Sequence, residues 1–427
     1  MGVVSGIAVA GFKLLVGGVE WLALGWAGGA WSELPALAVL LVPVAGGLLV
    51  GIGLRLGGIA GNPEHGVTEV IRAATMDLEE FPHREVPLKV SLAALSLGTG
   101  ASLGPEDPAV EIGGAAGEWV GRRRGLDHGS VRALVASGAA GGISAVLFTP
   151  IAGILFAIEV FAVRVWSRAI LLVAASALLA WGTMRLLLPG AMLDLGVEAG
   201  VLEVLPLRVL VFCLGVGLLA GVVSVVQVRL TYGVREVFLG RIPLPAWVKP
   251  AIGGAALGVS GLFLPELLGP GYGTIEGIVG GELSGAGLLA ALLVGKMLLM
   301  AVSFGSGLLG GFFAPAFFIG AALGALFAVG PGGWLAPGVG MGTLALIGLA
   351  AALAGMVHAP LTAAVSAAAL SGSWGLLPHL LVACYASHLT ARRMVRGSLY
   401  THELRRTDGG VGQGSGSEEF GDQPDLR

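Results

Sequence analysis

The stretch SLGTGASLGPEDPAVEIGGAAG at residues 96–117 recurs 207 residues later as SFGSGLLGGFFAPAFFIGAALG at residues 303–324. The two stretches align without a gap and are identical at 10 of 22 positions, whereas the composition alone would give roughly two or three matches. This internal repeat predicts two related halves, about residues 1–200 and 205–400, arranged either in parallel or inverted.

The composition around the repeat is that of a membrane protein. Only 12% of the 427 residues are charged and 55% are hydrophobic, compared with about 25% charged residues in soluble domains. Residues 297–391 contain no Asp, Glu, Lys or Arg, and a membrane-spanning helix needs about 20 mostly apolar residues. We therefore predict an all-α polytopic protein of the cell membrane. Residues 1–405 would form the transmembrane domain, and the polar, Gly- and Ser-rich residues 407–427 a disordered tail.

Charge and cysteine content argue against several other classes. The formal net charge is −3, so no basic field is available to hold a nucleic-acid backbone. Cys213 and Cys384 lie far apart in apolar sequence, which indicates two buried thiols rather than a disulfide framework or a metal site. We expect no cofactor and no metal.

Each copy of the repeat has the same design, in which glycines are followed by a proline and then by an apolar helix. Gly104 precedes Pro105 and Pro108 in the first copy, and Gly311 precedes Pro315 in the second. Because proline favours the first helical turn and glycine permits close approach, each copy predicts a helix N-terminus inside the membrane. The unpaired N–H groups and the positive dipole end at such a terminus bind anions. The alternative is that these glycines only allow tight helix packing.

Glu106, two residues after Gly104, is the residue that most strongly indicates a function. A carboxylate at an intramembrane helix start is costly, and it is a functional candidate for that reason. It can occupy the anion site as a tethered competitor, and protonation would release it. Asp107 beside it can repel anions, share the proton or simply cap the helix.

These segments together resemble the CLC family of chloride channels and proton/chloride antiporters, over about residues 10–405. SFGSGLLGGFFAPAFFIG resembles the family's GxFxP segment, and GASLGPEDPAVEIGG occupies the place of its G(K/R)EGP segment. The resemblance implies an inverted-repeat homodimer in the lipid bilayer that transports chloride or a similar anion, with one pore in each subunit. It implies that Glu106 is the gating glutamate, which exchanges protons. It also implies an anion-binding set made of His65, Gly66, Val67, Phe312, Phe313 and Tyr400.

Several positions depart from the family pattern. His65 stands where the family has an anion-coordinating serine, Thr68 replaces a proline, and Asp107 replaces a glycine. The inner proton-transfer glutamate of the antiporters corresponds to Val160, which follows Glu159.

Val160 cannot carry a proton, and we expect Glu159 to face protein, because neighbouring residues on a helix point about 100° apart. The sequence thus favours anion transport with weak or absent proton exchange. If water or His65 replaced the missing relay, the chain would instead be a strict proton-coupled antiporter.

An intramembrane enzyme, such as a protease, is the remaining class. It would need a nucleophile and a base in a wet cavity. The segment Gly305-Ser306-Gly307 lacks a glycine two positions before the serine, and His358 and His379 have no evident serine partner. We therefore predict that the chain is not an enzyme. For Lys296, the only lysine in a long apolar stretch, we expect a structural role.

Overall fold

The computed structural model describes residues 1–25, 30–59, 66–75, 83–165, 167–190, 195–196, 206–402 and 404. His65 and the predicted tail at 407–427 lie outside the described residues. Within these ranges the chain is nearly all helical, with connecting turns and loops and no β-strand, which confirms the all-α prediction. In the part of the chain that the structure describes, the one β-type pairing is an isolated bridge between Gly104 and Gly311.

Each half contributes its own set of α-helices to the described residues. The first half contains α1 (Gly2–Leu24), α2 (Ala36–Leu56), α3 (Val67–Thr75), α4 (Val86–Gly98), α5 (Glu106–Arg123), α6 (His128–Leu147), α7 (Pro150–Glu159) and α8 (Arg168–Leu187). The second half contains α9 (Val209–Glu236), α10 (Lys249–Gly261), α11 (Tyr272–Val279), α12 (Ala286–Ser306), α13 (Phe313–Val329), α14 (Met341–Val357), α15 (Pro360–Leu370) and α16 (Leu377–Met394).

Long helices are interspersed with helices too short to cross a membrane, unlike the helices of a simple transmembrane bundle. Among the described residues, six helices are long and apolar enough to cross a membrane: α1, α2, α6, α8, α9 with its continuation to Arg241, and α12. By contrast, α7 has 10 residues and is about 15 Å long, half the thickness of the hydrocarbon layer. Such partial helices place polar helix ends at membrane depth, where protein must surround them.

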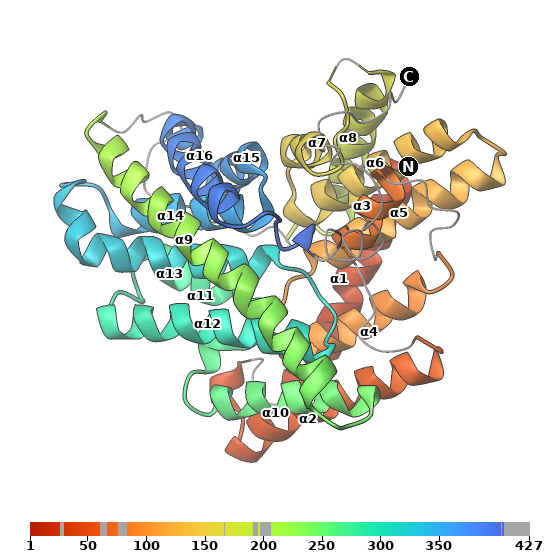
Figure 1. Cartoon of the computed structure of the whole chain (residues 1–427), viewed down its shortest axis with the longest axis horizontal. Coiled ribbons are helices and arrows are strands. Elements are labelled where there is room, and N and C mark those ends of the chain that lie inside the picture. The colour runs from red at the N-terminus through yellow and green to blue at the C-terminus, as the bar shows by residue number, and fades with distance from the viewer. Residues whose placement is uncertain are drawn as a thin grey trace, which may run out of the picture.

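The two halves are inverted, and the central glycines show how. Gly104 N–H donates to the Gly311 carbonyl at 2.8 Å, and Gly311 N–H donates to the Gly104 carbonyl at 2.6 Å. These two residues occupy equivalent positions in the repeat, 207 residues apart. A reciprocal antiparallel pair of equivalent residues lies on a twofold axis, and that axis relates the halves. In Figure 1, α5 to α8 lie on one side of the view and α12 to α16 on the other.

Equivalent glycines also make equivalent helix contacts in the two halves. A Cβ on Gly113 of α5 would lie 2.0 Å from the Gly138 carbonyl oxygen of α6, and a Cβ on Gly320 of α13 would lie 2.5 Å from the Gly348 carbonyl oxygen of α14. The two helix pairs α5–α6 and α13–α14 are thus packed backbone to backbone. Within the repeat, some glycines therefore pack helices closely, while Gly104 and Gly311 precede the starts of α5 and α13.

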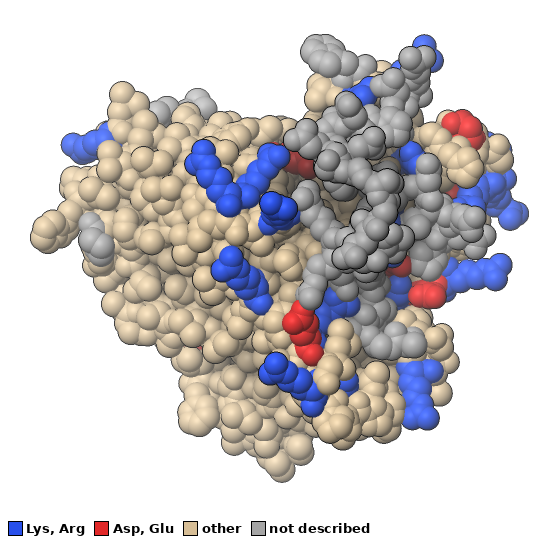
Figure 2. Space-filling model, in the orientation of Figure 1, with Lys and Arg blue, Asp and Glu red and all other residues tan. Residues whose placement is uncertain are grey.

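The outer surface is apolar, as a protein surrounded by lipid requires. The long helix α9 exposes Val211, Leu214, Leu218 and Val222, which recur every three or four residues and form one stripe. Lys and Arg side chains gather at the centre and right of the face drawn in Figure 2, and the lower left of that face is tan.

Candidate functional site

The first turns of α5 and α13 meet at the centre of the molecule, because both helices begin just after the Gly104–Gly311 pair. The first N–H groups of each helix have no partner within the helix. The sequence of α13 contains no ionisable residue, so its first turn offers partial positive charge alone. Acidic side chains of α5 lie against this turn.

Glu106 lies fully buried at the first residue of α5. The Tyr272 hydroxyl of α11 donates to its Oε1 at 2.5 Å, and the Ala314 N–H in the first turn of α13 contacts the same carboxylate. The gate residue predicted from the sequence is therefore held by one helix start and one tyrosine.

Asp107 also lies buried and is held by a second tyrosine. The Tyr400 hydroxyl donates to Asp107 Oδ1 at 2.7 Å, and the Phe312 N–H contacts the carboxylate. The main chain of Tyr400 is fixed because the Thr68 hydroxyl of α3 donates to its carbonyl at 3.2 Å. Its ring packs on that of Phe312, with centroids 5.7 Å apart. Thr68, which departs from the family pattern, therefore ties α3 to Tyr400.

A third carboxylate of α5 occupies the start of α3. The Gly66 N–H donates to Glu111 Oε2 at 2.9 Å, and Glu111 is buried. Gly66 has φ +68°, a left-handed conformation that favours glycine, and its Cα lies against the Asp107 side chain. Val67 follows as the fully buried first residue of α3.

The structure brings most of the predicted set together. Glu106, Gly66, Val67, Phe312, Phe313 and Tyr400 are all buried around the starts of α3, α5 and α13. His65 is outside the described residues, so the structure does not place it. The anion-binding role of these residues remains a prediction.

Three functional candidates were missed by sequence reasoning. Tyr272 had a signal, since the repeat aligns it with His65 at the same offset of 207. Glu111 could have been found from its spacing, because it lies four residues after Asp107 on the same helix face. Lys13 of α1, which interacts electrostatically with Glu106, had no signal in the sequence.

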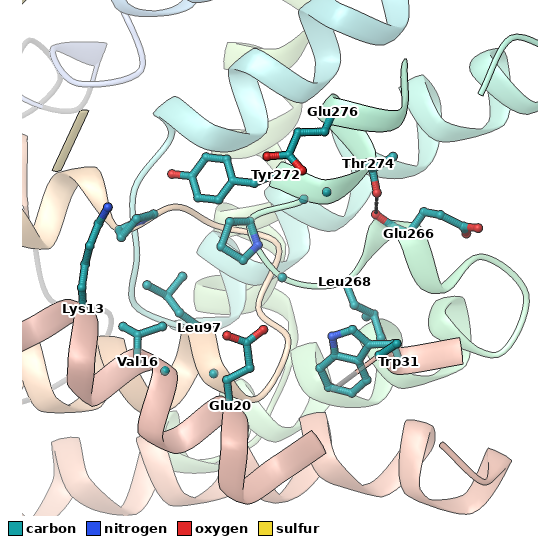
Figure 3. Close-up of a pocket in the computed structure, with 18 of the residues that line it drawn as sticks. Lys13, Val16, Glu20, Trp31, Leu97, Glu266, Leu268, Tyr272, Thr274 and Glu276 are labelled. Atoms are coloured by element: carbon teal, nitrogen blue, oxygen red, sulfur yellow. Dashed lines mark hydrogen bonds between the residues drawn. The ribbon is translucent and has the colours of Figure 1, made fainter. Parts of the chain in front are cut away.

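A cavity of about 710 Å³ opens beside the gate. Figure 3 shows Lys13 and Glu20 reaching into it from α1, and Tyr272 and Glu276 from α11. Because Tyr272 both lines the cavity and donates to Glu106, its ring stands between the cavity and the buried carboxylate. The cavity therefore ends at Tyr272, on the side of the ring opposite the Glu106 carboxylate.

Glu159 faces protein, as predicted. Its carboxylate accepts hydrogen bonds from the N–H groups of Leu361 and Thr362, both at 2.8 Å, and from the Thr362 hydroxyl at 2.6 Å. The carboxylate therefore pairs with two N–H groups in the first turn of α15 that have no partner within the helix. Its negative charge is also favourable at a helix N-terminus.

Replacing Glu159 by Ala should therefore destabilise the protein without changing how transport responds to pH. Two main-chain donors would lose their partner, at a cost of about 2–4 kcal/mol. We expect a lower thermal unfolding midpoint in detergent and an unchanged pH profile of anion flux. Glu159→Gln, which keeps one acceptor oxygen, should recover part of the lost stability. An altered pH profile would instead place Glu159 on the proton route.

Two other residues singled out in the sequence, Lys296 and Ser306, hydrogen-bond to main-chain carbonyl groups. Lys296 is fully buried and donates to the carbonyls of Leu267 at 3.3 Å and Gly269 at 2.7 Å, with its ammonium over the Phe318 ring. The Ser306 hydroxyl donates to the Ser303 carbonyl at 3.0 Å. Lys296 therefore fixes the segment before α11, which agrees with its expected structural role.

Comparison with known proteins places these features in a family. The family model described as voltage gated chloride channel matches residues 46–392. A putative chloride channel protein ClcB-like of Ralstonia nicotianae is 30% identical, with 95% of each chain covered. The chloride channel protein CLC-f of Arabidopsis thaliana is 32% identical, over 89% of this chain and 51% of that protein.

Solved structures agree. The crystal structure of a slow cyanobacterial Cl⁻/H⁺ antiporter superimposes with a TM-score of 0.84 at 25% identity, covering 95% of this chain and 96% of that one. A CLC-type fluoride/proton antiporter shares the fold, with a TM-score of 0.76 at 20% identity over 93% and 94% of the two chains. The matched segment contains both copies of the repeat and both helix starts at the centre. The chain therefore belongs to the voltage-gated chloride channel family, the CLC family, of multi-pass membrane proteins that transport anions.

Proposed function

We propose that this protein carries chloride or a similar anion across the cell membrane, and that Glu106 gates its passage. The observation that supports this most strongly is the fully buried Glu106 carboxylate, set against the first turn of α13 and held by Tyr272. A carboxylate in a site built from N–H and hydroxyl donors stands where a free anion would be stabilised.

The donors around this position carry partial charges only. Main-chain N–H groups at Phe312 to Ala314 and the hydroxyls of Tyr272 and Tyr400 attract an anion without a full positive charge in contact. An anion held in this way can leave as readily as it enters. Gly66, Val67 and His65 complete the proposed binding set.

The direct test is anion flux in vesicles. Purified protein is reconstituted into chloride-loaded liposomes, an ionophore for potassium removes the opposing voltage, and released chloride is measured with an electrode. We expect chloride release well above that of protein-free liposomes. Release equal to that of protein-free liposomes would refute the proposed function.

We further propose a homodimer with one pathway in each subunit, on the basis of the family resemblance. Helices α7 and α8 expose Ile151, Leu171 and Leu178, which gives an apolar face for a partner chain. Cross-linking in membranes before detergent extraction would trap a species of twice the chain mass. A single-chain species alone would contradict this assembly.

The mode of transport follows from Val160. Because Val160 cannot bind a proton, we expect the reversal potential under opposed chloride and pH gradients to be set by chloride alone. The measurement uses reconstituted protein and a voltage-sensitive dye.

A second candidate, strict chloride/proton exchange, is favoured by one observation. Acidic side chains of α5 and α3 run from Asp107 toward the surface without using the Val160 position. A reversal potential displaced by a fixed chloride-to-proton ratio would establish exchange and overturn the passive mode.

A further inference from the structure

Asp107 is held by the same groups that the proposed function assigns to the transported anion. Tyr400 donates to its Oδ1 at 2.7 Å, and the Phe312 N–H contacts the carboxylate. A Cβ on Gly311 would lie 2.7 Å from the same oxygen, so the carboxylate fills the space that this glycine leaves open. Asp107 is only 2% exposed, which means that it does not reach solvent.

Helix capping does not explain these contacts. The residue at the N-cap of α5 is Pro105, and no side chain makes a capping hydrogen bond there. Asp107 is the second residue of the helix, and its tyrosine and main-chain donors come from the segment after α16 and from the start of α13. The repeat supports the same conclusion, since the equivalent residue of α13 is Ala314 and that helix begins without an acid.

We propose that Asp107 is a second gating residue, a tethered carboxylate that competes with the transported anion for the Tyr400 hydroxyl and the Phe312 N–H. This inference rests on the proposed function and adds a second proton-dependent step to it. When an anion takes the place of the carboxylate, the displaced side chain stays in a buried, apolar environment, where an unpaired charge is costly. It therefore binds one proton. One anion and one proton enter together, so the net charge of the site does not change.

Glu111 is placed to deliver that proton. It lies one helical turn after Asp107 and on the same face of α5. One oxygen of its carboxyl group accepts the Gly66 N–H, and the side chain interacts with Glu69 of α3. Two carboxyl groups in contact can share one proton between them, and the Glu69 member of this pair is partly exposed, with 12% of its side chain accessible. The Glu111–Glu69 pair is therefore a proton store next to the second gate.

The store is connected to the surface. Lys89 of α4 donates to both oxygens of Glu69 at 3.1 Å, and it also forms an ion pair with Glu85 at 3.3 Å. Glu85 has 45% of its side chain exposed. This route lets a proton reach the second gate from the exposed Glu85 without passing the Val160 position.

Other ionisable groups also face the two gating carboxylates. Helix α13 contains no ionisable residue. The ionisable residues of α6, His128 and Arg132, lie at its N-terminal end, which packs on the C-terminal end of α5, away from the two carboxylates. The groups from other elements are Lys13 and Glu20 of α1, Glu69 of α3, Lys89 of α4, Tyr272 of α11, Tyr400, and Tyr232 of α9 behind Tyr400. All are kept in the variants below, so that a changed proton count reports the substituted acid.

Infrared difference spectra of Glu106→Gln protein test the proposal with Asp107 intact. Full-length protein in detergent is measured with and without sodium chloride. We expect chloride to produce the carbonyl band of a newly protonated carboxyl group, and the band should vanish in the Glu106→Gln/Asp107→Asn double variant. If chloride binds to Glu106→Gln protein without producing such a band, the second gate is refuted.

Calorimetry counts the protons. Chloride is titrated into full-length protein in two buffers of different ionisation enthalpy, which gives the protons taken up for each chloride bound. Asp107→Asn should take up one proton fewer than the unsubstituted protein and bind chloride roughly tenfold more tightly at alkaline pH, because the competitor has lost its charge. Glu118→Gln is the matched control, since Glu118 is another buried acid of α5, paired with His83 and Arg122. It should leave the proton count unchanged.

The outcomes separate the two proposals. Absence of chloride binding to the unsubstituted protein would refute the proposed function. Normal chloride binding, with the same proton count and affinity in Asp107→Asn, would refute the second gate alone. If Asp107→Asn does not fold, the infrared measurement on Glu106→Gln protein decides.

Discussion

Chloride flux through Glu106→Gln protein is expected to exceed that of the unsubstituted protein at alkaline pH and to depend on pH less steeply. Glutamine has the shape of the protonated side chain and no charge, so it cannot compete with chloride at the start of α13. A carboxylate that must bind one proton before an anion passes lowers the flux by up to about tenfold for each pH unit. That contribution should disappear in the variant, and the dependence that remains should reflect Asp107.

The measurement is chloride efflux from liposomes between pH 5 and pH 8.5, with Glu118→Gln as the control. That control removes a buried carboxylate from the same helix but leaves the gate intact, so it should retain the original pH profile. The double variant Glu106→Gln/Asp107→Asn should show flux that is nearly independent of pH. A Glu106→Gln profile that matched the unsubstituted protein would remove Glu106 from the gate.

Replacing Gly113 by Leu is expected to prevent folding. A Cβ at this position would lie 2.0 Å from the carbonyl oxygen of Gly138, and a Cβ on Gly138 would lie 2.0 Å from that of Gly113. Overpacking against movable side chains costs about 1–3 kcal/mol, and here the obstacle is helix backbone on both sides. Helix α5 would be pushed off α6, and Glu106, Asp107 and Glu111 in its first two turns would leave the helix starts around them.

Size-exclusion chromatography and thermal unfolding in detergent measure this effect. Gly182→Leu in α8 is the control, because nothing lies within 4 Å of a Cβ placed there. It should remain monodisperse, with an unfolding midpoint close to that of the unsubstituted protein. Monodisperse Gly113→Leu protein with an unchanged midpoint would show that α5 and α6 are not packed this closely.

Much of the fold was predictable from the repeat and the apolar runs, because glycine spacing and charge distribution are local properties of the sequence. The orientation of the halves was not predictable, since aligned residues look the same whether their copies are parallel or inverted. The hydrogen bonds between Gly104 and Gly311 supplied that orientation.

The candidate site was predictable only in part. Glu106 stood out because a carboxylate at an intramembrane helix start is costly wherever it points. The contact between Asp107 and Tyr400 could not be predicted, because the two residues are 293 positions apart in the sequence and only the fold brings them together. Tyr272 was visible as the repeat counterpart of His65, yet the alignment gave no reason to expect a hydroxyl directed at Glu106.

The reciprocal Gly104–Gly311 pair also bears on how such a chain could arise from a half-length ancestor that assembled as an antiparallel pair. In such a pair of identical subunits, the residue on the twofold axis would lie next to the same residue of the other subunit. Every substitution there would therefore change both crossing main chains at once. A Cβ on either glycine would meet the start of a helix, at Glu106 and Ala314 for Gly104 and at Asp107 for Gly311, which leaves glycine as the residue that fits. Fusion of two copies into one gene would lift that constraint, since each position could then change alone. Both positions are nevertheless glycine in this chain, and the two main chains still cross there without a side chain between them.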